Sequence, residues 1–320
     1  ELAPYGSAAT STTPTTVADY LMARFYPNDP QIIHARFNTG EVRLDDGTVL
    51  TSDSPYMPGE RIWYFRELAD EPELPSDMPV LYEDEHVLAI DKPHFLPTTP
   101  RGAYIAQTAL TKLRVREQNP LLIPIHRLDR PTAGVLLFAK TVEARRPFQM
   151  MFQHRRVSKT YRAVAPVPAD PAAAERALSA EGLQVRSHIQ KIRDQLQVQQ
   201  LSEEQCAAQG VEPNTLTTAK ILQTFTPSAQ AVEGWRAEPN REWALYDLAP
   251  HTGKTHQLRA HLNMLGSPIL GDVLYPQVLP DAPDRPEYPL QLLAYSLHFE
   301  HPITGERVDL YSGRSLVAAA

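Results

Sequence analysis

One aspartate, Asp129, stands where a carboxylate could react with a bound substrate. It lies near the centre of the polar segment 125–134, which reads IHRLDRPTAG, and a short apolar run follows Gly134. The length of that run predicts a buried strand rather than a helix. A carboxylate a few residues before a core strand is held by the rigid part of a fold and still faces solvent. Such an aspartate suits chemistry; the ordinary alternative is a turn residue between two solvated arginines, Arg127 and Arg130.

A second polar segment, residues 252–261, reads TGKTHQLRAH. It follows residues 243–248, where we expect a strand. Thr255 is a suitable helix N-cap, and Gly266 is suited to end a helix. We therefore expect a helix that begins at Thr255 and stops at Gly266.

This expected helix has two faces. Leu258 falls on an apolar face, whereas His256 and Arg259 fall on a polar stripe. The histidines 251, 256 and 261 invite a metal-site interpretation, but a spacing of five turns a helix by about 140° and separates them. No acidic residue stands at ligand spacing either. We expect no metal site, and an arginine such as Arg259 would ordinarily form a surface ion pair.

Both segments resemble motifs of one family, the RluA-type RNA pseudouridine synthases. Residues 126–134 match its signature His-Arg-Leu-Asp-x-x-Thr-(Ser/Ala)-Gly, and residues 252–261 match Thr-Gly-Arg-Thr-His-Gln-(Ile/Leu)-Arg-Val-His, with Lys254 in place of the arginine. A lysine there gives up a bidentate grip on phosphate. Three further segments match family motifs in the same order along the chain: 80–93, 159–163 and 302–306.

The resemblance implies a reaction and a set of residues. Uridine in RNA is detached from its ribose, turned and rejoined through carbon, without a metal, nucleotide or organic cofactor. Asp129 corresponds to the catalytic aspartate, Tyr161 to the tyrosine that packs on the target base, and Arg259 to the basic partner of the aspartate. Leu258 would form an apolar wall, and Arg127 would fill the space that the flipped base leaves. The remaining substrate-binding candidates are His126, Arg130, Thr132, Lys254 and His256.

Two alternatives stay open at this stage. One is a non-catalytic RNA-binding or ribosome-assembly factor that keeps the fold. The other is a glycosidase that uses Asp129, although no second carboxylate stands in a recognisable motif with it. Taken alone, Tyr161 would be an ordinary sheet tyrosine. The chain contains no glycine-rich nucleotide motif, phosphate loop or Gly-x-Ser-x-Gly segment, which argues against nucleotide, phosphoryl and serine-hydrolase chemistry.

Charge is unevenly distributed along the chain. The net charge of −7 disfavours a nucleic-acid partner at first sight. Residues 78–165, however, hold 14 Lys and Arg against 7 Asp and Glu, while the segments on both sides are acidic. A basic segment around the signature predicts an RNA-binding footprint. The cations that we expect to track phosphates are Lys140, Arg145, Arg146, Arg155 and Arg156.

Composition shifts divide the chain into parts. We expect a disordered lead-in over 1–16, a small N-terminal α/β domain over 17–70, a Pro- and acid-rich linker over 71–77, and a catalytic domain over 78–320. The N-terminal domain weakly resembles a small RNA-binding module named after a ribosomal protein. It is acidic, so a structural appendage is an equal alternative. Its segment 40–50 alternates around an Asp-Gly turn and predicts a hairpin.

For the catalytic domain the resemblance implies an α+β fold: a mixed, largely antiparallel sheet with flanking helices. Helices are expected near 107–117, 141–153, 172–178 and 202–208, and a terminal hairpin over 292–311. Residues 166–242 carry no chemical motif and suggest a decorated connection of the sheet. The chain has no transmembrane run or signal peptide, and a single cysteine, Cys206, excludes a disulfide framework. We expect a cytoplasmic protein, with a monomer as the default.

Overall fold

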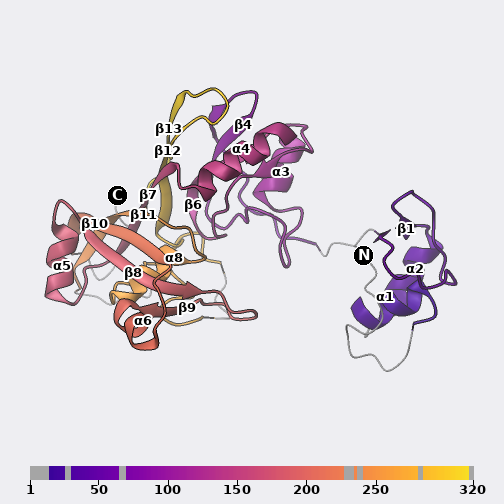
Figure 1. Cartoon of the computed structure of the whole chain (residues 1–320), viewed down its shortest axis with the longest axis horizontal. Coiled ribbons are helices and arrows are strands. Elements are labelled where there is room, and N and C mark those ends of the chain that lie inside the picture. The colour runs from indigo at the N-terminus through magenta and orange to yellow at the C-terminus, as the bar shows by residue number, and fades with distance from the viewer. Residues whose placement is uncertain are drawn as a thin grey trace. The chain divides into compact units, whose positions relative to one another are not determined.

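The chain divides into two compact units, residues 1–70 and 71–320 (Figure 1). The structure, a computed structural model, describes residues 14–25, 30–64, 70–226, 234–235, 241–279 and 284–316. No helix within these ranges combines the length and apolarity that a membrane crossing would need. Of the expected lead-in, residues 1–13 lie outside the described residues, and Thr16 forms an isolated bridge with Pro55.

The N-terminal unit packs two helices and a two-stranded sheet around one small core. The helices are α1 (Val17–Phe25) and α2 (Pro30–Asn38), and the strands are β1 (Arg43–Leu44) and β2 (Ile62–Trp63). The chain folds back over 40–50 as predicted: an antiparallel bridge joins Arg43 to Val49, and the N–H groups of Leu44 and Leu50 donate to the carbonyl oxygens of Thr48 and Val42. This hairpin is short, and β1 pairs with β2 in addition. Two-residue strands are too short to hold a hairpin without a third segment.

The second unit is built on one large sheet. Its strands are β3 (Val80–Glu83), β4 (Val87–Lys92), β5 (Ile123–Pro124), β6 (Ala133–Ala139), β7 (Val157–Pro166), β8 (Leu183–Gln190), β9 (Gln199–Ser202), β10 (Thr215–Phe225), β11 (Trp243–Pro250), β12 (Leu292–Glu300) and β13 (Arg307–Tyr311). The order is β3-β4-β6-β12-β7-β11-β10-β8-β9, with β5 beside β6 and β13 beside β12. Among these described strands only β6 and β12 pair in parallel. The expected mixed, largely antiparallel α+β fold is confirmed.

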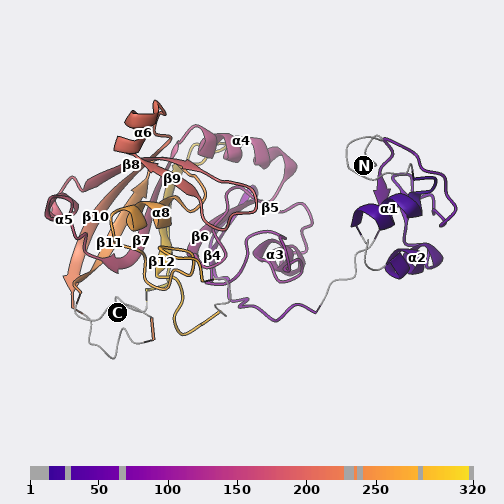
Figure 2. The ribbon, with the colours of Figure 1, turned by 90° about the horizontal axis from the view of Figure 1, so that it is seen from below.

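Five described helices flank this sheet: α3 (Ala109–Arg116), α4 (Val142–Gln153), α5 (Pro171–Leu178), α6 (Glu203–Gln209) and α8 (Gln257–Met264). The N-cap at Thr141 is confirmed, since its side chain accepts a hydrogen bond from the backbone of Ala144. So is the capping box of Ser202 and Gln205. Helices α3 and α4 pack at one end of the sheet, and α5, α6 and α8 at the other (Figures 1 and 2).

The unit therefore has two halves that meet at the middle of the sheet. We call β3, β4, β6 and β12 with α3 and α4 the first half, and β7, β11, β10, β8 and β9 with α5, α6 and α8 the second half. Segment 166–242 is more than a decorated connection, because β8, β9 and β10 form most of the second half's edge. The β8–β9 hairpin extends toward the side on which α3 lies (Figures 1 and 2).

Gly134 lets the parallel strands approach each other. Its φ is +113°, and a Cβ at this position would lie 2.2 Å from the carbonyl oxygen of Ala294 on β12. Only glycine tolerates both the backbone angle and the contact. The last residue of the signature is thus a packing requirement, and it fixes where the loop before β6 emerges.

Candidate active site

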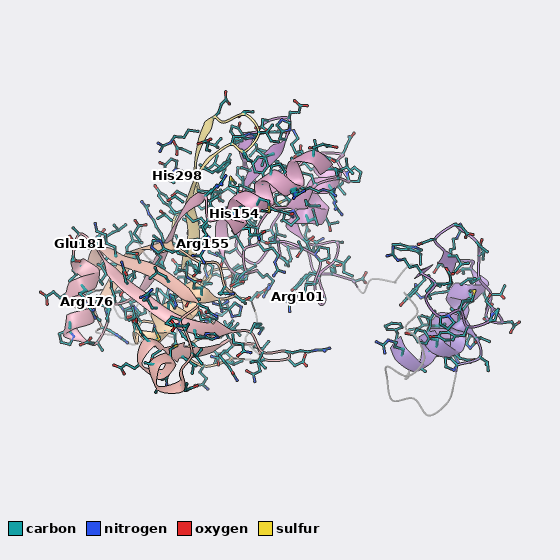
Figure 3. All side chains as sticks on the ribbon, viewed as in Figure 1. Arg101, His154, Arg155, Arg176, Glu181 and His298 are labelled. Carbon is teal, nitrogen blue, oxygen red and sulfur yellow. The ribbon has the colours of Figure 1, made fainter. Side chains whose placement is uncertain are left out.

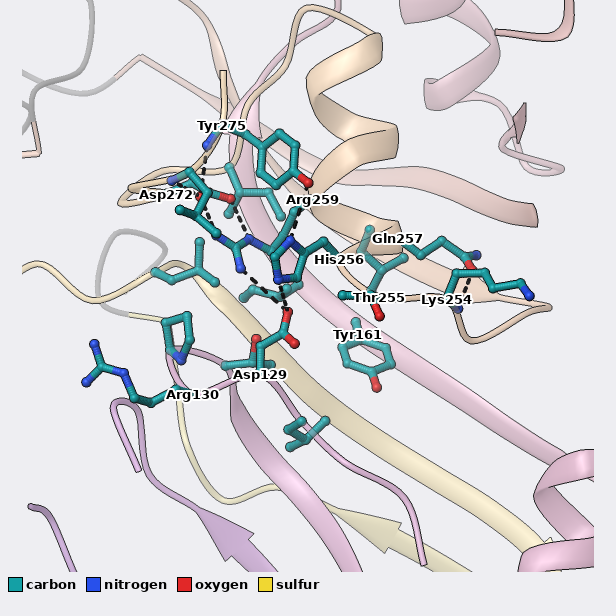
Figure 4. Close-up of a pocket in the computed structure, with 18 of the residues that line it drawn as sticks. Asp129, Arg130, Tyr161, Lys254, Thr255, His256, Gln257, Arg259, Asp272 and Tyr275 are labelled. Carbon is teal, nitrogen blue, oxygen red and sulfur yellow. Dashed lines mark hydrogen bonds and ion pairs between the residues drawn. The ribbon is translucent and has the colours of Figure 1, made fainter. Parts of the chain in front are cut away.

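The cleft between the two halves contains the sequence-predicted residues. It has a volume of about 2740 Å³, and Asp129, Tyr161, Leu258 and Arg259 are among its lining residues. Asp129 lies on the loop between β5 and β6, and its side chain is 34% exposed. Figure 4 shows its carboxylate pointing toward residues of α8 and of the segment after it. The carboxylate is therefore reachable from the cleft.

A buried lysine holds this loop through its backbone. The ammonium of Lys92, at the end of β4, donates to the carbonyl oxygens of Pro93 at 2.9 Å, Leu96 at 2.7 Å and Arg130 at 3.3 Å. Burial lowers the pKa of the Lys92 ammonium to about 7, and the nearby Asp129 carboxylate opposes that shift. One side chain thus joins the residue after Asp129 to the core of the first half.

Two further contacts fix the loop on both sides of Asp129. The hydroxyl of Thr98 donates to the carbonyl oxygen of Leu128 at 2.9 Å and accepts the Leu128 N–H at 3.2 Å. The Nδ1 of His94 lies 2.6 Å from the carbonyl oxygen of Pro131. Bonds to backbone atoms on both sides leave the Asp129 side chain free to face the cleft.

Arg259 reaches the cleft from the second half. Its guanidinium, 2% exposed, makes a bidentate pair with Asp272, with Nε to Oδ2 at 2.7 Å and Nη2 to Oδ1 at 2.6 Å. The remaining Nη1 lies 3.5 Å from Oδ2 of Asp129. The structure therefore brings Asp129 and Arg259 together, as expected, but the shorter and stronger partner of Arg259 is Asp272.

His256 is the second group that faces the carboxylate. Its Nε2 lies 3.8 Å from Oδ2 of Asp129, and its backbone has a φ of +54°. Burial lowers the pKa of the His256 imidazole, and Asp129 opposes that shift. His256 itself is the N-cap residue of α8, so the predicted N-cap at Thr255 is wrong. No side chain caps this helix; a backbone turn precedes it, in which the N–H of Gln257 donates to the carbonyl oxygen of Lys254 at 3.1 Å.

Tyr161 lies on β7 at the junction of the two halves, where it packs against hydrophobic clusters of both. Its neighbours in the sheet are Leu248 and Ala294. Burial raises the pKa of the Tyr161 phenol, and the charge of Asp129 raises it further. The phenol is therefore neutral near pH 7. Leu258 is buried in the same cluster, consistent with an apolar wall.

The other predicted contacts fall into two groups. Arg127 and Lys254 are exposed on the cleft wall. Arg130, His126 and Thr132 also line it but are engaged within the protein. Arg130 pairs with Asp284 at 2.5 Å. His126 accepts the Leu137 N–H and stacks on Phe152, and burial lowers its pKa to about 3. Thr132 is buried and closes a turn on the Asp129 carbonyl.

Of the cations expected to track phosphates, two have internal partners. Lys140 forms an ion pair with Glu83, and Arg145 donates to the carbonyl oxygen of Leu121. Arg155 lies just past α4, lines the cleft and has no carboxylate partner among the described residues (Figure 3). Arg101 also lines the cleft, again without a carboxylate partner among the described residues. Of the predicted set, only Arg155 is among the residues that line the cleft, and Arg101 was not predicted.

The three histidines that invited a metal interpretation have separate surroundings. His251 bonds to the Thr218 hydroxyl, and His261 is buried among the hydroxyls of Ser187, Thr215 and Thr217. The partners of His251 and His261 are hydroxyl groups, which are poor zinc ligands, whereas His256 faces the carboxylate of Asp129.

Asp272 and Tyr275 were not predicted from the sequence. Asp272 has a fully buried carboxylate, which also accepts the N–H groups of Leu274 and Tyr275. The hydroxyl of Tyr275 contacts His256. Both residues belong to the run GDVLY at 271–275, whose closely spaced Asp and Tyr after a glycine were the one available signal.

Comparison with known proteins identifies the class. Residues 86–264 match the family model described as RNA pseudouridylate synthase, which is more than half of the chain. The chain belongs to this family. Within it the protein is of the RluA type, as the motifs indicated, and it is an RNA pseudouridine synthase, an isomerase.

Curated relatives extend over most of the chain. An uncharacterized RNA pseudouridine synthase from Synechocystis is 30% identical over 257 residues, 80% of this chain and 78% of that protein. The tRNA pseudouridine synthase C of Pasteurella multocida is 29% identical and covers 73% of this chain and 90% of its own length. The ribosomal large subunit pseudouridine synthase D of Vibrio vulnificus is 28% identical, with 85% and 79% covered.

A solved structure shares the fold. Human RNA Pseudouridylate Synthase Domain Containing 1 superposes with a TM-score of 0.54 at 24% identity, covering 77% of this chain and 86% of that one.

Proposed function

We propose that this synthase uses Asp129 as its essential catalytic residue and modifies uridines in structured rRNA or tRNA. The observation that carries the proposal is the position of the Asp129 carboxylate. It is open to a large cleft, and the guanidinium of Arg259 and the imidazole Nε2 of His256 face it. A reactive oxygen needs both features, access for the substrate and fixed donors that steady its charge.

The chemistry follows from this placement. Asp129 acts on the ribose as nucleophile or initiates base release, so that the bond between C1′ and N1 breaks. The base turns, a bond forms between C1′ and C5 as any bond from Asp129 to C1′ breaks, the proton on C5 leaves to solvent, and N1 takes up a proton, so that the product is an isomer of the substrate. Arg259 stays charged throughout and offers Nη1 to the carboxylate. Burial raises the pKa of Tyr161, so its neutral ring can stack on the flipped base, a contact worth about 1–3 kcal/mol.

The cleft walls suit a folded RNA. A target uridine inside a stacked strand must be extruded, at a cost of a few kcal/mol. Arg127 is exposed beside Asp129 and is placed to occupy the vacated position, while Arg101, Arg155 and Lys254 offer charges to phosphates. The names of the relatives support tRNA or ribosomal RNA as the substrate class.

Tritium release tests the proposal. RNA that carries 5-tritiated uridine and lacks modification would release tritium with the wild-type protein. Asp129→Asn should reduce release to background while RNA retention on a filter stays within about twofold. Glu181→Gln is the matched control, because Glu181 is an exposed carboxylate near α5 (Figure 3), and it should leave release unchanged. If Asp129→Asn still releases tritium, Asp129 is not the catalytic residue; if even the wild type releases none, a binding role replaces catalysis.

A further inference from the structure

Tyr275 touches both groups that face Asp129. The residue is 5% exposed, and its backbone N–H donates to Asp272, the partner of Arg259. Its ring centroid lies 5.5 Å from the Arg259 guanidinium carbon, a cation–π contact. Its hydroxyl lies 3.3 Å from Nδ1 of His256 (Figure 4). Tyr275 therefore connects the two donors on the second-half side of the cleft.

The direction of the hydroxyl hydrogen follows from its neighbours. The backbone N–H of Val198 donates to the Tyr275 oxygen at 3.0 Å. An amide N–H cannot accept, so the single hydroxyl hydrogen of Tyr275 is available for Nδ1 of His256. A neutral imidazole that accepts at Nδ1 carries its hydrogen on Nε2. That nitrogen is the one that lies 3.8 Å from the Asp129 carboxylate.

The surroundings of His256 favour the neutral ring. Burial lowers its pKa, and this effect is the largest; Asp129 and Asp272 raise the pKa, whereas Arg259 and Lys191 lower it. The backbone adds a second sign of constraint. A φ of +54° is uncommon for a residue with a side chain, and such strain persists where the surrounding structure imposes it, often at functional sites.

We propose that Tyr275 is a positioning residue of the synthase, which holds His256 as the Nε2–H tautomer and so gives Asp129 a second N–H donor beside Arg259. The proposal rests on the proposed role of Asp129. It explains why a buried tyrosine stands between a histidine and an arginine that both face the same carboxylate.

The same hydroxyl ties the site to the β8–β9 hairpin. Val198 lies just before β9, and the neighbouring Gln197 side chain donates to the carbonyl oxygens of Leu274 and Pro276. The hairpin tip lines the cleft and presents Arg193, whose side chain is 96% exposed. RNA that binds to the tip therefore contacts the hairpin whose residues Gln197 and Val198 bond to the Tyr275 segment, which orients His256.

Nitrogen-15 NMR of protein labelled at histidine tests the tautomer directly. The signals of His256 are assigned by their loss in His256→Gln. We expect the wild type to carry its hydrogen on Nε2 and Tyr275→Phe to move the ring toward a mixture of tautomers. Tyr311→Phe, on the exposed strand β13, is the control and should change nothing at His256. A wild-type hydrogen on Nδ1, or an unchanged tautomer in Tyr275→Phe, would overturn the proposal.

A double-mutant cycle tests the consequence for catalysis. Tyr275→Phe keeps the ring over Arg259 and removes both hydrogen bonds of the hydroxyl, the one to His256 and the one from Val198. Because the bond to His256 is the one that acts on the site, kcat should fall by about 3- to 10-fold with KM unchanged. In a His256→Gln background, where an amide N–H replaces Nε2–H, the same change should have no further effect. Additive losses would show that Tyr275 acts by packing alone and would contradict the proposal. If wild-type protein releases no tritium, the proposed function fails, and the NMR measurement still decides the tautomer.

Discussion

Asp129 and Arg259 face each other across the cleft, but the two halves hold them by different means. In the first half the loop is fixed through backbone carbonyls, by Lys92 and by Thr98, and the Asp129 side chain has no short bond to any residue that the structure describes. In the second half the side chain of Arg259 is fixed by another side chain, because it forms a bidentate pair with Asp272.

The difference teaches how the site tolerates a change of charge. In the proposed reaction with Asp129 as nucleophile, the carboxylate loses its negative charge when it bonds to the ribose, and a guanidinium that depended on it alone would then be buried and unpaired. The bidentate pair of Arg259 with Asp272, at 2.6 Å, does not involve Asp129. Likewise, the loop keeps its place because its anchors do not involve the reacting carboxylate. Each group is thus held in position before the reaction and during it.

Removing Asp272, the side chain that holds Arg259, should have the largest effect on the unfolding free energy. Asp272→Ala leaves the guanidinium of Arg259 buried without its partner, which costs about 3–5 kcal/mol of unfolding free energy. Chemical denaturation would measure the loss. The double variant Asp272→Ala with Arg259→Met should recover much of that stability, because the charge is removed as well, yet remain inactive. A single variant as stable as the wild type would mean that Asp272 is not the anchor.

Removing Lys92, which holds the loop of Asp129 through backbone carbonyls, should lower the unfolding free energy by a smaller amount. Lys92→Met keeps the length and burial of the side chain but leaves three carbonyl oxygens without their donor. We expect a loss of about 1–3 kcal/mol, and a lower kcat because the loop that carries Asp129 is no longer held. Denaturation and single-turnover tritium release measure the two effects. Full activity in this variant would show that the loop holds its place without Lys92.

A fall in pH should lower the unfolding free energy through a buried histidine in each half. Burial lowers the pKa of His261 in the second half to about 4 and that of His126 in the first half to about 3. Below about pH 6.5 the unfolded chain takes up a proton at each ring and the folded chain does not, so the unfolding free energy falls as pH drops toward 4. Each histidine contributes a slope of up to about 1.4 kcal/mol per pH unit.

The change His261→Gln removes one of these titrating rings, and His126→Phe removes the other. Each variant should show a flatter dependence of unfolding free energy on pH by that amount, whatever its stability at pH 7. Denaturation at a series of pH values between 4 and 7 measures the slopes. Slopes equal to that of the wild type would mean that the rings are already protonated in the folded protein.

Surface cations at the cleft should have the smallest effect. Arg155→Ala removes one charge from the cleft, so RNA affinity should fall several-fold and the slope of log affinity against log salt should decrease by about 0.7–1. Arg176→Ala is the matched control, since Arg176 is exposed on α5 and does not line the cleft (Figure 3). Equal effects of the two changes would show that binding does not distinguish the cleft from the rest of the surface.

The sequence was sufficient to predict that Asp129 and Arg259 meet, because both lie in continuous motifs. Asp129 precedes a strand with a clear apolar run, but the exposed polar stripe expected on the helix of Arg259 is wrong, since residues 257–262 are all buried. The predicted helix start at Thr255 is wrong because the N-cap is His256, with a left-handed backbone and no side-chain cap bond, and the cap rules do not anticipate such a start. The alternating pattern of 183–190, which forms β8, was available and was missed.

Other features could not be predicted from one sequence. Asp272 lies in a segment without helix or strand, and its meeting with Arg259 depends on how that segment returns to the sheet. The burial of Lys92 is equally hard to foresee, because lysine is almost never fully buried. Tertiary contacts, rather than local pattern, decide both.

Mapping of pseudouridines in cellular tRNA and ribosomal RNA tests the central claim most directly. Cells that lack this protein are compared with the same cells supplied with the wild type or with Asp129→Asn at equal protein level. We expect a specific uridine to be unmodified without the protein, restored to pseudouridine by the wild type and left unmodified by Asp129→Asn. Restoration by the asparagine variant would contradict the role assigned to this carboxylate.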